Sequence, residues 1–203
     1  MNTLTELDEF KRLILIVGTP GVGKTITSSL LASKLDGLHI DLAELVKQEE
    51  LISDVDEVRE TLVADVEKVS ERVQEITRDC AGDVIVDGHY AFDVVPAEKV
   101  HRVFVIRKHP DELETFLEKR GFRNKKLWEN LAAEVLDICL SDAVEACGVD
   151  RVCEIDASGK SVEAIVEDII RVLDGKSECR VGTIDWLGRL AEDGRLHKYL
   201  IHF

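Results

Sequence analysis

Apolar and polar residues follow two patterns along this chain, short apolar runs and longer stretches of helical periodicity, and the two patterns alternate. Five short runs have mostly apolar inner positions: 12–18, 38–42, 83–88, 102–107 and 151–156. Such runs are typical of strands buried in a parallel sheet. Between and beyond them, longer stretches predict amphipathic helices: 24–35, 43 onward, 54–77, 110–121, 126–146 and 161–173. Alternating strands and helices predict a three-layer α/β domain.

The turn after the first predicted strand carries the most specific motif. Residues 18–25 have the sequence GTPGVGKT, which satisfies the pattern G-x-x-x-x-G-K-[ST] at every fixed position. Glycines allow the backbone to turn sharply and bring N–H groups close to an anion, and the following helix adds its positive end. We therefore predict a cradle for nucleotide phosphates, in which Lys24 reaches the β- and γ-phosphates and Thr25 binds Mg²⁺. The predicted nucleotide contacts in this region are Gly18, Pro20, Gly21, Val22, Gly23, Lys24, Thr25 and Ile26.

A carboxylate for the same Mg²⁺ is expected at the end of a neighbouring strand. Asp87 closes the run VIVD, so its carboxylate is predicted to face the phosphates through a metal-bound water. The alternative is an aspartate that merely ends a strand. His89 follows two residues later, and its neutral imidazole is expected to orient a water or the Mg²⁺ shell. The alternative for His89 is a hydrogen bond to a backbone carbonyl.

Composition and charge narrow the functional classes. The chain has 203 residues and a formal net charge of −15, which argues against a general nucleic-acid binder. The polar, acidic start MNTLTELDEF lacks the apolar region of a signal peptide, and no apolar run approaches the ~20 residues that cross a bilayer. The 5 cysteines form no C-x-x-C pair, so we expect reduced thiols in a cytoplasmic protein that does not bind membranes.

Two other classes of phosphate-loop protein fit the chain poorly. Signal-transducing GTPases require D-x-x-G and N-K-x-D, whereas residues 87–90 are DGHY and residues 124–127 are NKKL. Large ring ATPases require a longer chain with a second helical domain. A small nucleotide kinase fits the length better.

Several segments together resemble one kinase family. They are GTPGVGKT (18–25), IDLAELVKQEE (40–50), VIVDGH (84–89), VFVIR (103–107) and EKRGFRNKKLWENLAAEV (118–135). Over roughly residues 13–173 the chain is similar to the atypical adenylate kinases of archaea and eukaryotic nuclei. The resemblance implies a nucleoside-monophosphate-kinase-like fold with a five-stranded parallel sheet of order 2-3-1-4-5. The segment IDASGKSVEAI (155–165) also looks like the loop whose backbone contacts adenine in such kinases.

The same resemblance implies an activity and partners. It implies transfer of the γ-phosphoryl group of Mg-ATP to AMP, accompanied by ATPase activity. It further implies a role in assembling the small ribosomal subunit, with a ribosomal protein as partner. The match is looser over residues 49–65, where the acceptor nucleotide is expected, so a kinase for another nucleoside monophosphate stays open. An ATPase assembly factor with little kinase activity is the other alternative.

Positive charge gathers in the segment RGFRNKK (120–126) of this acidic chain. Phosphoryl transfer requires positive charge on the migrating group, so we predict a lid in which Arg120 and Arg123 contact ATP. The alternative is a solvated turn between helices. Arg120 joins Lys24, Asp87 and His89 in the predicted catalytic set.

Residues for the acceptor nucleotide are less clearly marked. Asp41 ends the second predicted strand and is expected to position the acceptor, with helix N-capping as the alternative. Arg59 is the arginine of the looser region and is predicted to bind the acceptor phosphate. Arg107, at the end of the fourth strand, is a weaker candidate than Arg120 for the cation that acts on the migrating phosphoryl group, because strand-end arginines often pair with a nearby carboxylate.

The predicted domain organisation divides the chain in two. Residues 1–175 form the kinase domain, with a short acceptor insertion at about 42–78 and a lid at about 120–127. Within the insertion, the acidic span 54–71 is expected to be a solvated helix face, and a docking surface for a basic partner is the alternative. Residues 176–203 form a C-terminal extension, expected to fold back onto the core or else to dock on a partner.

Overall fold

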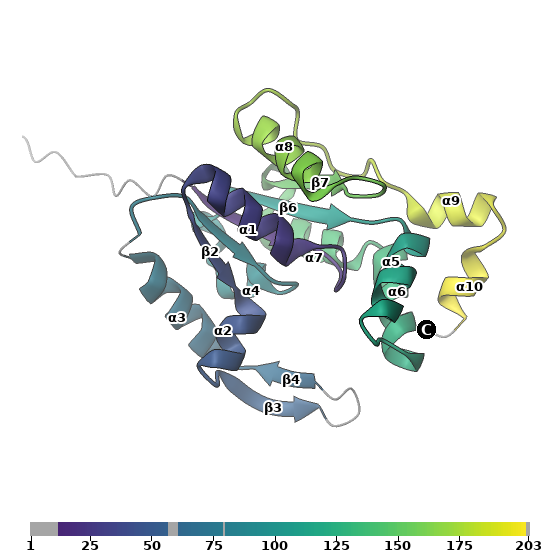
Figure 1. Cartoon of the computed structure of the whole chain (residues 1–203), viewed down its shortest axis with the longest axis horizontal. Helices are drawn as coiled ribbons and strands as arrows, with labels where there is room; N and C mark the ends of the chain where they lie inside the picture. Colours follow the sequence, from purple (N-terminus) through teal and green to yellow (C-terminus); the bar gives the residue numbers. More distant parts are fainter. Residues whose placement is uncertain (1–11, 57–60, 79, 202–203) are drawn as a thin grey trace, which may run out of the picture.

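A five-stranded parallel sheet forms the centre of the molecule (Figure 1). The computed structural model describes residues 12–56, 61–78 and 80–201. The sheet strands are β1 (Leu13–Val17), β2 (Leu38–Asp41), β5 (Val84–Asp87), β6 (Arg102–Arg107) and β7 (Val152–Asp156). Their order is β2-β5-β1-β6-β7, and each neighbouring pair is parallel. When only the five strands of this sheet are numbered along the chain, the order is the expected 2-3-1-4-5. The predicted fold class is therefore confirmed.

Helices cover both faces of the sheet because successive side chains of a strand point to opposite faces. Ile14 and Ile16 of β1 pack with residues of α1 (Lys24–Leu35) and α8 (Val162–Leu173). Leu15 and Val17 of β1 belong to the core on the opposite face. That core also holds residues of α2 (Leu42–Gln48), α3 (Val66–Arg78), α4 (Ala91–Val94) and α7 (Ile138–Cys147). Burying each such aliphatic side chain stabilises the fold by about 1.5–3 kcal/mol.

The remaining elements lie near the carboxyl ends of the strands or join them. They are β3 (Ile52–Asp56), β4 (Thr61–Ala64), α5 (Pro110–Lys119), α6 (Asn124–Val135), α9 (Trp186–Glu192), α10 (Leu196–Leu200) and the 3₁₀ turns Ala97–Lys99 and Val149–Arg151. Figure 1 shows α2 with the β3–β4 hairpin on one side of the β1–α1 connection, and α5 with α6 on the other. The connection that holds GTPGVGKT is thus flanked by two substructures.

The prediction of helix throughout 54–77 is wrong in its first part. Residues of β3 and β4 form an antiparallel hairpin, and helix α3 begins only at Val66. β-Branched residues such as Ile52, Val55 and Val63 favour strands. In the hairpin the register partner of Ile52 is Ala64, and that of Val55 is Leu62. The acidic span 54–71 is therefore a solvated helix face only from Val66 onward.

The single helix expected over 126–146 is also wrong. The structure has two helices, α6 and α7, separated at Leu136 and Asp137. Asp137 adopts a left-handed conformation with φ 57°, which interrupts the helical hydrogen bonds. Its carboxylate forms an ion pair with Arg107, so a contact made through the fold accompanies the break.

The cysteines differ from the expectation of reduced thiols throughout. Cys153 of β7 and Cys179 form a disulfide with a Cα–Cα distance of 5.0 Å, whereas Cys80, Cys139 and Cys147 are free. The pair forms because the chain after α8 runs along the edge strand β7, where Glu154 N donates to Arg180 O at 2.8 Å. A separation of 26 residues gives no local signal of such a pair.

The C-terminal extension packs against the same core as α5 and α6. Its side chains Trp186, Leu190 and Tyr199 are at most 1% exposed. Leu190 and Tyr199 belong to the core cluster that contains α1 and α8. In the described ranges, none of the helices combines the length and the apolar character that a membrane crossing requires.

Candidate active site

The backbone of the β1–α1 connection requires glycine at three positions. Gly18, Gly21 and Gly23 have φ values of 138°, 94° and 102°, which other residues rarely adopt. A Cβ atom on Gly18 would lie 2.5 Å from Ile106 O, and one on Gly21 would lie 2.8 Å from Leu117 Cδ2 of α5. The glycines therefore give this segment, which we call the phosphate-binding loop (residues 18–25), its close contacts with β6 and α5.

The amino end of α1 adds to the anion-binding character of the loop. Helix α1 starts at Lys24, and Gly23 before it provides no side-chain cap. Free N–H groups and the positive end of the helix dipole therefore point out of the helix start, where an anion is favoured. Thr25 and Ile26 of the first turn are exposed, so both are accessible to a ligand.

Lys24 lies against the loop itself. Its Nζ donates to Gly18 O at 2.8 Å and to Thr19 O at 3.1 Å. Desolvation in the loop lowers the pKa of Lys24, and this effect outweighs the opposing charges of nearby carboxylates such as Asp87 and Glu134. Phosphate oxygens would supply the negative charge that this desolvated ammonium lacks.

The carboxyl ends of β2 and β5 bring two aspartates beside the loop. Asp41 and Asp87 are register partners, and Asp87 is also the partner of Ile16 in β1. Asp87 is 1% exposed; its Oδ2 is buried without a hydrogen-bond partner, and its Oδ1 lies 3.5 Å from His39 Nε2. An orphaned buried carboxylate oxygen is costly to maintain unless a ligand satisfies it.

The oxygen donors near Asp87 fit Mg²⁺. Thr25 Oγ1 lies 3.3 Å from Asp41 Oδ2, so a hydroxyl and a second carboxylate adjoin the Asp87 carboxylate. Oxygen ligands of this kind suit Mg²⁺, which in kinases takes one or two protein ligands together with phosphate oxygens and waters. Among the described residues, no group of three or more His, Cys, Asp or Glu side chains would hold a metal by itself. The ion therefore fits here as a partner of bound nucleotide.

Of the two residues predicted to bind the acceptor nucleotide, only Asp41 lies in the part of the chain that the structure describes. Asp41 Oδ1 accepts from Ala43 N at 2.9 Å and from Glu44 N at 3.1 Å, so Asp41 caps α2. Its Oδ2 is directed to Thr25, which places the carboxylate at the metal side of the site. Arg59 lies outside the described residues.

His89 lies just beyond Asp87, and the residue is partly exposed to solvent. The ring makes an edge contact with Tyr90 at a centroid distance of 4.9 Å. Partial desolvation, followed by the charge of Lys24, lowers the pKa of His89 below its ordinary value. The imidazole is therefore predominantly neutral at pH 7, the form that can accept a proton from water.

The predicted lid residues lie at the turn between α5 and α6. Arg120 and Arg123 are both exposed. The Arg120 guanidinium lies 5.8 Å from the Phe116 ring centroid, and Arg123 NH1 donates to Glu118 O and Phe122 O. Local contacts therefore hold both arginines in this structure, beside a helix whose Leu117 packs on the loop.

The loop predicted to contact adenine lies at the carboxyl end of β7. Asp156 Oδ1 accepts from Ser158 N at 2.9 Å, and Ser158 Oγ accepts from His109 N at 2.8 Å. His109 also caps α5, so this loop is joined to the helix that carries the lid.

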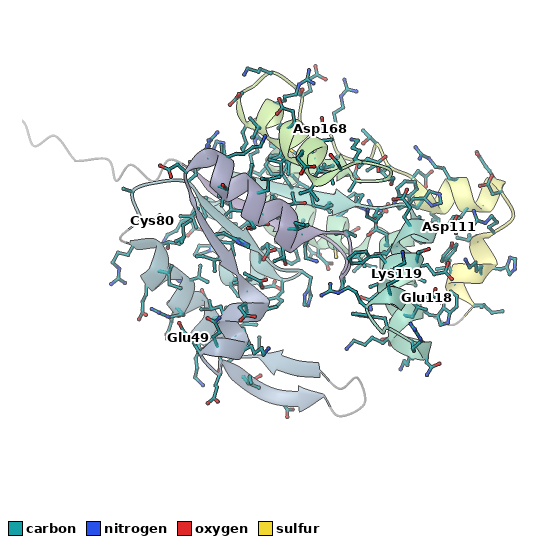
Figure 2. The ribbon with its side chains drawn as sticks, viewed as in Figure 1. Glu49, Cys80, Asp111, Glu118, Lys119 and Asp168 are labelled. Atoms are coloured by element: carbon teal, nitrogen blue, oxygen red, sulfur yellow. A yellow bond between two sulfur atoms is a disulfide. The ribbon has the colours of Figure 1, made fainter. Side chains whose placement is uncertain are left out.

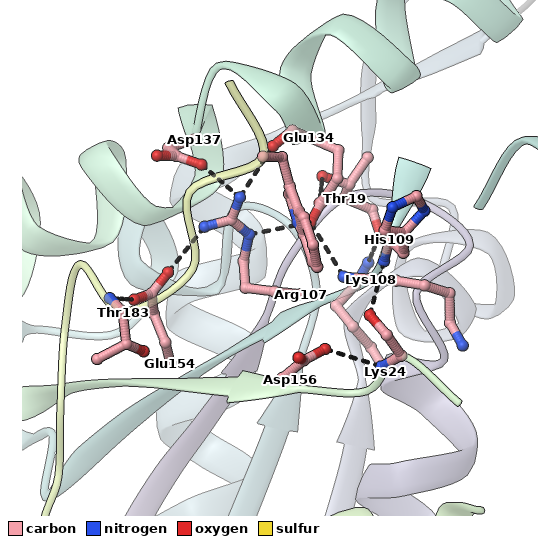
Figure 3. A network of polar contacts seen from close by, with 12 residues as sticks. Thr19, Lys24, Arg107, Lys108, His109, Glu134, Asp137, Glu154, Asp156 and Thr183 are labelled. Atoms are coloured by element: carbon pink, nitrogen blue, oxygen red, sulfur yellow. Dashed lines mark hydrogen bonds and ion pairs between the residues drawn. The ribbon is translucent and has the colours of Figure 1, made fainter. Parts of the chain in front are cut away.

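A buried polar network adjoins the phosphate-binding loop and is absent from the predicted site (Figure 3). Arg107 pairs with Glu134, Asp137 and Glu154, which agrees with the local-carboxylate alternative for this arginine. Thr19 of the loop donates to Glu134 Oε2 at 2.6 Å. The sequence contains one signal for these groups: a charged side chain on an otherwise apolar face of a helix or strand, as for Glu134, which follows Leu127 and Leu131 at helical spacing.

Known proteins resemble the chain at two levels. Among solved structures, a shikimate kinase from Bacteroides thetaiotaomicron has a TM-score of 0.55 at 17% identity, covering 80% of this chain and 98% of its own. A thymidylate kinase from Candida albicans has a TM-score of 0.54 at 14% identity, with coverage of 81% and 92%. Likeness at this identity shows the fold alone, that of a P-loop kinase.

Sequence relatives are much closer. Residues 14–137 match the family model described as an AAA domain. A Methanosarcina acetivorans protein is 37% identical over 188 residues, covering 86% of this chain and 97% of its own. A Methanocaldococcus jannaschii protein is 38% identical over 173 residues, with coverage of 85% and 92%; both are named "Putative adenylate kinase". With a phosphate-binding loop on a P-loop kinase fold and relatives of this similarity along most of its length, the chain belongs to the adenylate kinase-like family of nucleotide kinases.

Proposed function

We propose that the protein transfers the γ-phosphoryl group of Mg-ATP to AMP, forming two molecules of ADP, and hydrolyses ATP slowly when no acceptor is bound. One observation carries the proposal: the desolvated Lys24 and the orphaned carboxylate of Asp87 adjoin the same glycine-rich loop. Nucleotide phosphates and their Mg²⁺ would satisfy both groups together.

Each group has a defined part in the proposed reaction. Loop N–H groups and Lys24 hold the β- and γ-phosphates, while Thr25 and Asp87 hold Mg²⁺, Asp87 through water. When bound, Mg²⁺ neutralises charge on the phosphate oxygens. Arg120 then stabilises the charge that develops on the migrating group, and Arg123 contacts ATP from the same turn.

The acceptor side is proposed from the elements around β2. Asp41 and Arg59 position the monophosphate, and AMP is favoured because the sequence relatives carry the name adenylate kinase. The flanking substructures, α2 with the hairpin and α5 with α6, would exclude water from the migrating group when both nucleotides are present.

Slow hydrolysis is assigned to His89. Its lowered pKa keeps the imidazole neutral, and its position two residues after Asp87 allows it to orient a water when the acceptor is missing. His89→Ala is expected to lower hydrolysis more than phosphoryl transfer. Equal losses in both reactions would remove His89 from this role.

The deciding experiment measures ADP formation from Mg-ATP with AMP, CMP, GMP, UMP or dTMP, beside a control without acceptor. Fastest formation with AMP supports the proposal. Preference for another monophosphate would keep the kinase and change its substrate. Equal ADP release with and without every acceptor would overturn the kinase proposal and leave an ATPase.

A second candidate function is an ATPase that helps to assemble the small ribosomal subunit. The observation in its favour is the formal net charge of −15, which suits a basic ribosomal protein as partner. A pull-down from cell extract with and without ATP tests it. Recovery of neither a ribosomal protein nor precursor RNA would count against this candidate.

A further inference from the structure

One carboxylate, that of Glu134 in α6, joins the phosphate-binding loop to the C-terminal extension. Glu134 is 1% exposed, and each of its oxygens is hydrogen-bonded. Its Oε2 accepts from Thr19 Oγ1 at 2.6 Å. Its Oε1 accepts from Arg107 Nε at 2.9 Å, from Lys108 N at 3.0 Å and from Trp186 Nε1 at 3.3 Å. The loop, β6 and the extension thus meet at one buried anion (Figure 3).

The bond to Thr19 bears directly on the catalytic lysine. Thr19 is 1% exposed, and its carbonyl oxygen is one of the two acceptors of Lys24 Nζ. The other acceptor is Gly18 O, the preceding peptide. Anchoring the Thr19 hydroxyl on Glu134 therefore holds the backbone that Lys24 contacts. Because the groups are buried, loss of one partner would leave the other unsatisfied and the loop less well ordered.

The extension reaches this network at two points. Trp186 Nε1 donates to Glu134, and Thr183 N donates to Glu154 Oε2 at 2.8 Å. Trp186 is 1% exposed and lies edge-on to His109 at a centroid distance of 5.1 Å. Burial and this ring contact hold the indole N–H in place for Glu134.

Further contacts fasten the extension to the kinase fold away from the loop. The Cys153–Cys179 disulfide joins it to β7. Arg195 and Tyr199 both contact the Asp111 carboxylate of α5, which lies toward the C-terminal helices (Figure 2). These contacts fasten the extension to β7 and α5 and do not involve Glu134.

We propose that Glu134 and Trp186 are positioning residues for the phosphate-binding loop, so that the C-terminal extension completes the ATP site through Glu134 and Thr19. The inference rests on the proposed kinase function. It gives the C-terminal extension, which lies outside the predicted site, a part in ATP binding. It makes a specific demand: ATP binding depends on the indole N–H of Trp186, whereas the Michaelis constant for AMP does not.

The experiment measures the dissociation constant of Mg-ATP by calorimetry on the full chain, beside KM and kcat for both nucleotides. Thr19→Val is expected to weaken ATP binding about tenfold, and Trp186→Phe about threefold, the range of a buried hydrogen bond. Thr19→Ser, which keeps the hydroxyl, is expected to restore affinity to within about twofold. Because both changes act through Glu134, the double variant is expected near tenfold rather than about thirtyfold.

Tyr199→Phe is the matched control, since it removes one hydrogen-bonding group from the extension without contacting Glu134. It is expected to leave the ATP dissociation constant within about twofold. Unchanged ATP affinity in a Trp186→Phe protein that still melts cooperatively would overturn the inference. A loss of about thirtyfold in the double variant would also overturn it, because the two substitutions would then act independently. If Trp186→Phe does not fold, unchanged affinity in Thr19→Val overturns it instead. A wild-type protein that binds ATP but phosphorylates no monophosphate would overturn the proposed function and leave this comparison of affinities intact.

Discussion

Buried polar groups lie on both sides of the phosphate-binding loop, and the two sides differ in whether these groups have hydrogen-bond partners. On the β6 side, Arg107 and Glu134 are buried and hydrogen-bonded to several partners. On the β5 side, Asp87 Oδ2 and His39 Nε2 are buried without a hydrogen-bond partner, although the two side chains lie 3.5 Å apart. Similar chemical groups are therefore satisfied on one side of the loop and unsatisfied on the other.

This difference separates positioning from binding. A buried polar group without a partner costs about 1–3 kcal/mol, so a fold retains one where a ligand supplies what is missing. A group whose hydrogen bonds are all formed has no donor or acceptor left for a ligand, and it instead keeps its neighbours in place. This difference agrees with the proposed binding of ligand on the β5 side and the proposed support of the loop on the β6 side.

The largest expected effect comes from removing the loop cation. Lys24→Ala is expected to lower kcat at least about 10³-fold, a loss of more than about 4 kcal/mol, because the ammonium stabilises phosphate charge. The melting temperature is expected to hold or rise, since a desolvated charge is removed. Steady-state kinetics and calorimetry check both outcomes. The exposed Lys176→Ala is the control, and near-normal turnover in Lys24→Ala would contradict the assignment.

The next effect is on stability and tests the β6 side. Arg107→Met is expected to lower the free energy of unfolding by about 4 kcal/mol, because it leaves Glu134 and Glu154 buried without their cation. Burial alone would lower the pKa of Arg107, but the charges of Glu134 and Asp137 and their hydrogen bonds raise it above its ordinary value. Denaturant unfolding measures the loss. Arg180→Met, which removes an exposed ion pair with Glu178, should cost less than about 1 kcal/mol.

A somewhat smaller effect is expected from reducing the disulfide. Opening the Cys153–Cys179 link should lower the free energy of unfolding by about 3 kcal/mol, because the unfolded chain gains freedom. Thiol titration of the denatured protein should count three free thiols without reductant and five with it. Five thiols in protein kept from reductant would show that the link does not form.

The smallest effect is a pH dependence in the contact between α5 and the extension. The hydrogen bond from Arg195 has the largest influence on Asp111 and lowers the pKa of its carboxyl to about 2. The ionised carboxylate therefore adds stability that is present above pH ~4 and is lost as the pH falls toward about 2. Burial raises the pKa of Tyr199 to about 12, so its contribution is present below pH ~10 and is lost as pH rises toward about 12.

Melting temperatures across both pH ranges test this contact. Since Asp111 is partly exposed, solvent screening should keep its contribution below about 1 kcal/mol. Asp111→Asn should flatten the acid limb of the curve, and Tyr199→Phe should flatten the alkaline limb. Curves identical to the wild type in both variants would show that these groups do not couple to folding.

Local patterns were sufficient for most of the architecture. The strand runs and the helix 24–35 match the structure, because buried parallel strands and amphipathic helices each carry a periodic signature. The sheet order 2-3-1-4-5 also matches, but the family resemblance implied it and the periodicity did not. Gly18 and Lys24 could be proposed for the site for a related reason: the turn requires particular backbone angles and a phosphate ligand a particular charge, and both requirements appear within one short segment. Asp87 could be proposed as a metal carboxylate because it closes an apolar run, and the structure places that run next to β1.

The remaining features depend on contacts between distant parts of the chain. Thr19 and Glu134 are 115 positions apart, so no local window reveals that one anchors the other. The break at Asp137 accompanies an ion pair with Arg107, and the Cys153–Cys179 link requires the chain after α8 to run along β7. Periodicity reports which face of an element is buried, but it does not report which other element lies against that face. Partner choice of that kind arises only when the folded chain brings α6, β6 and the extension together around one buried carboxylate.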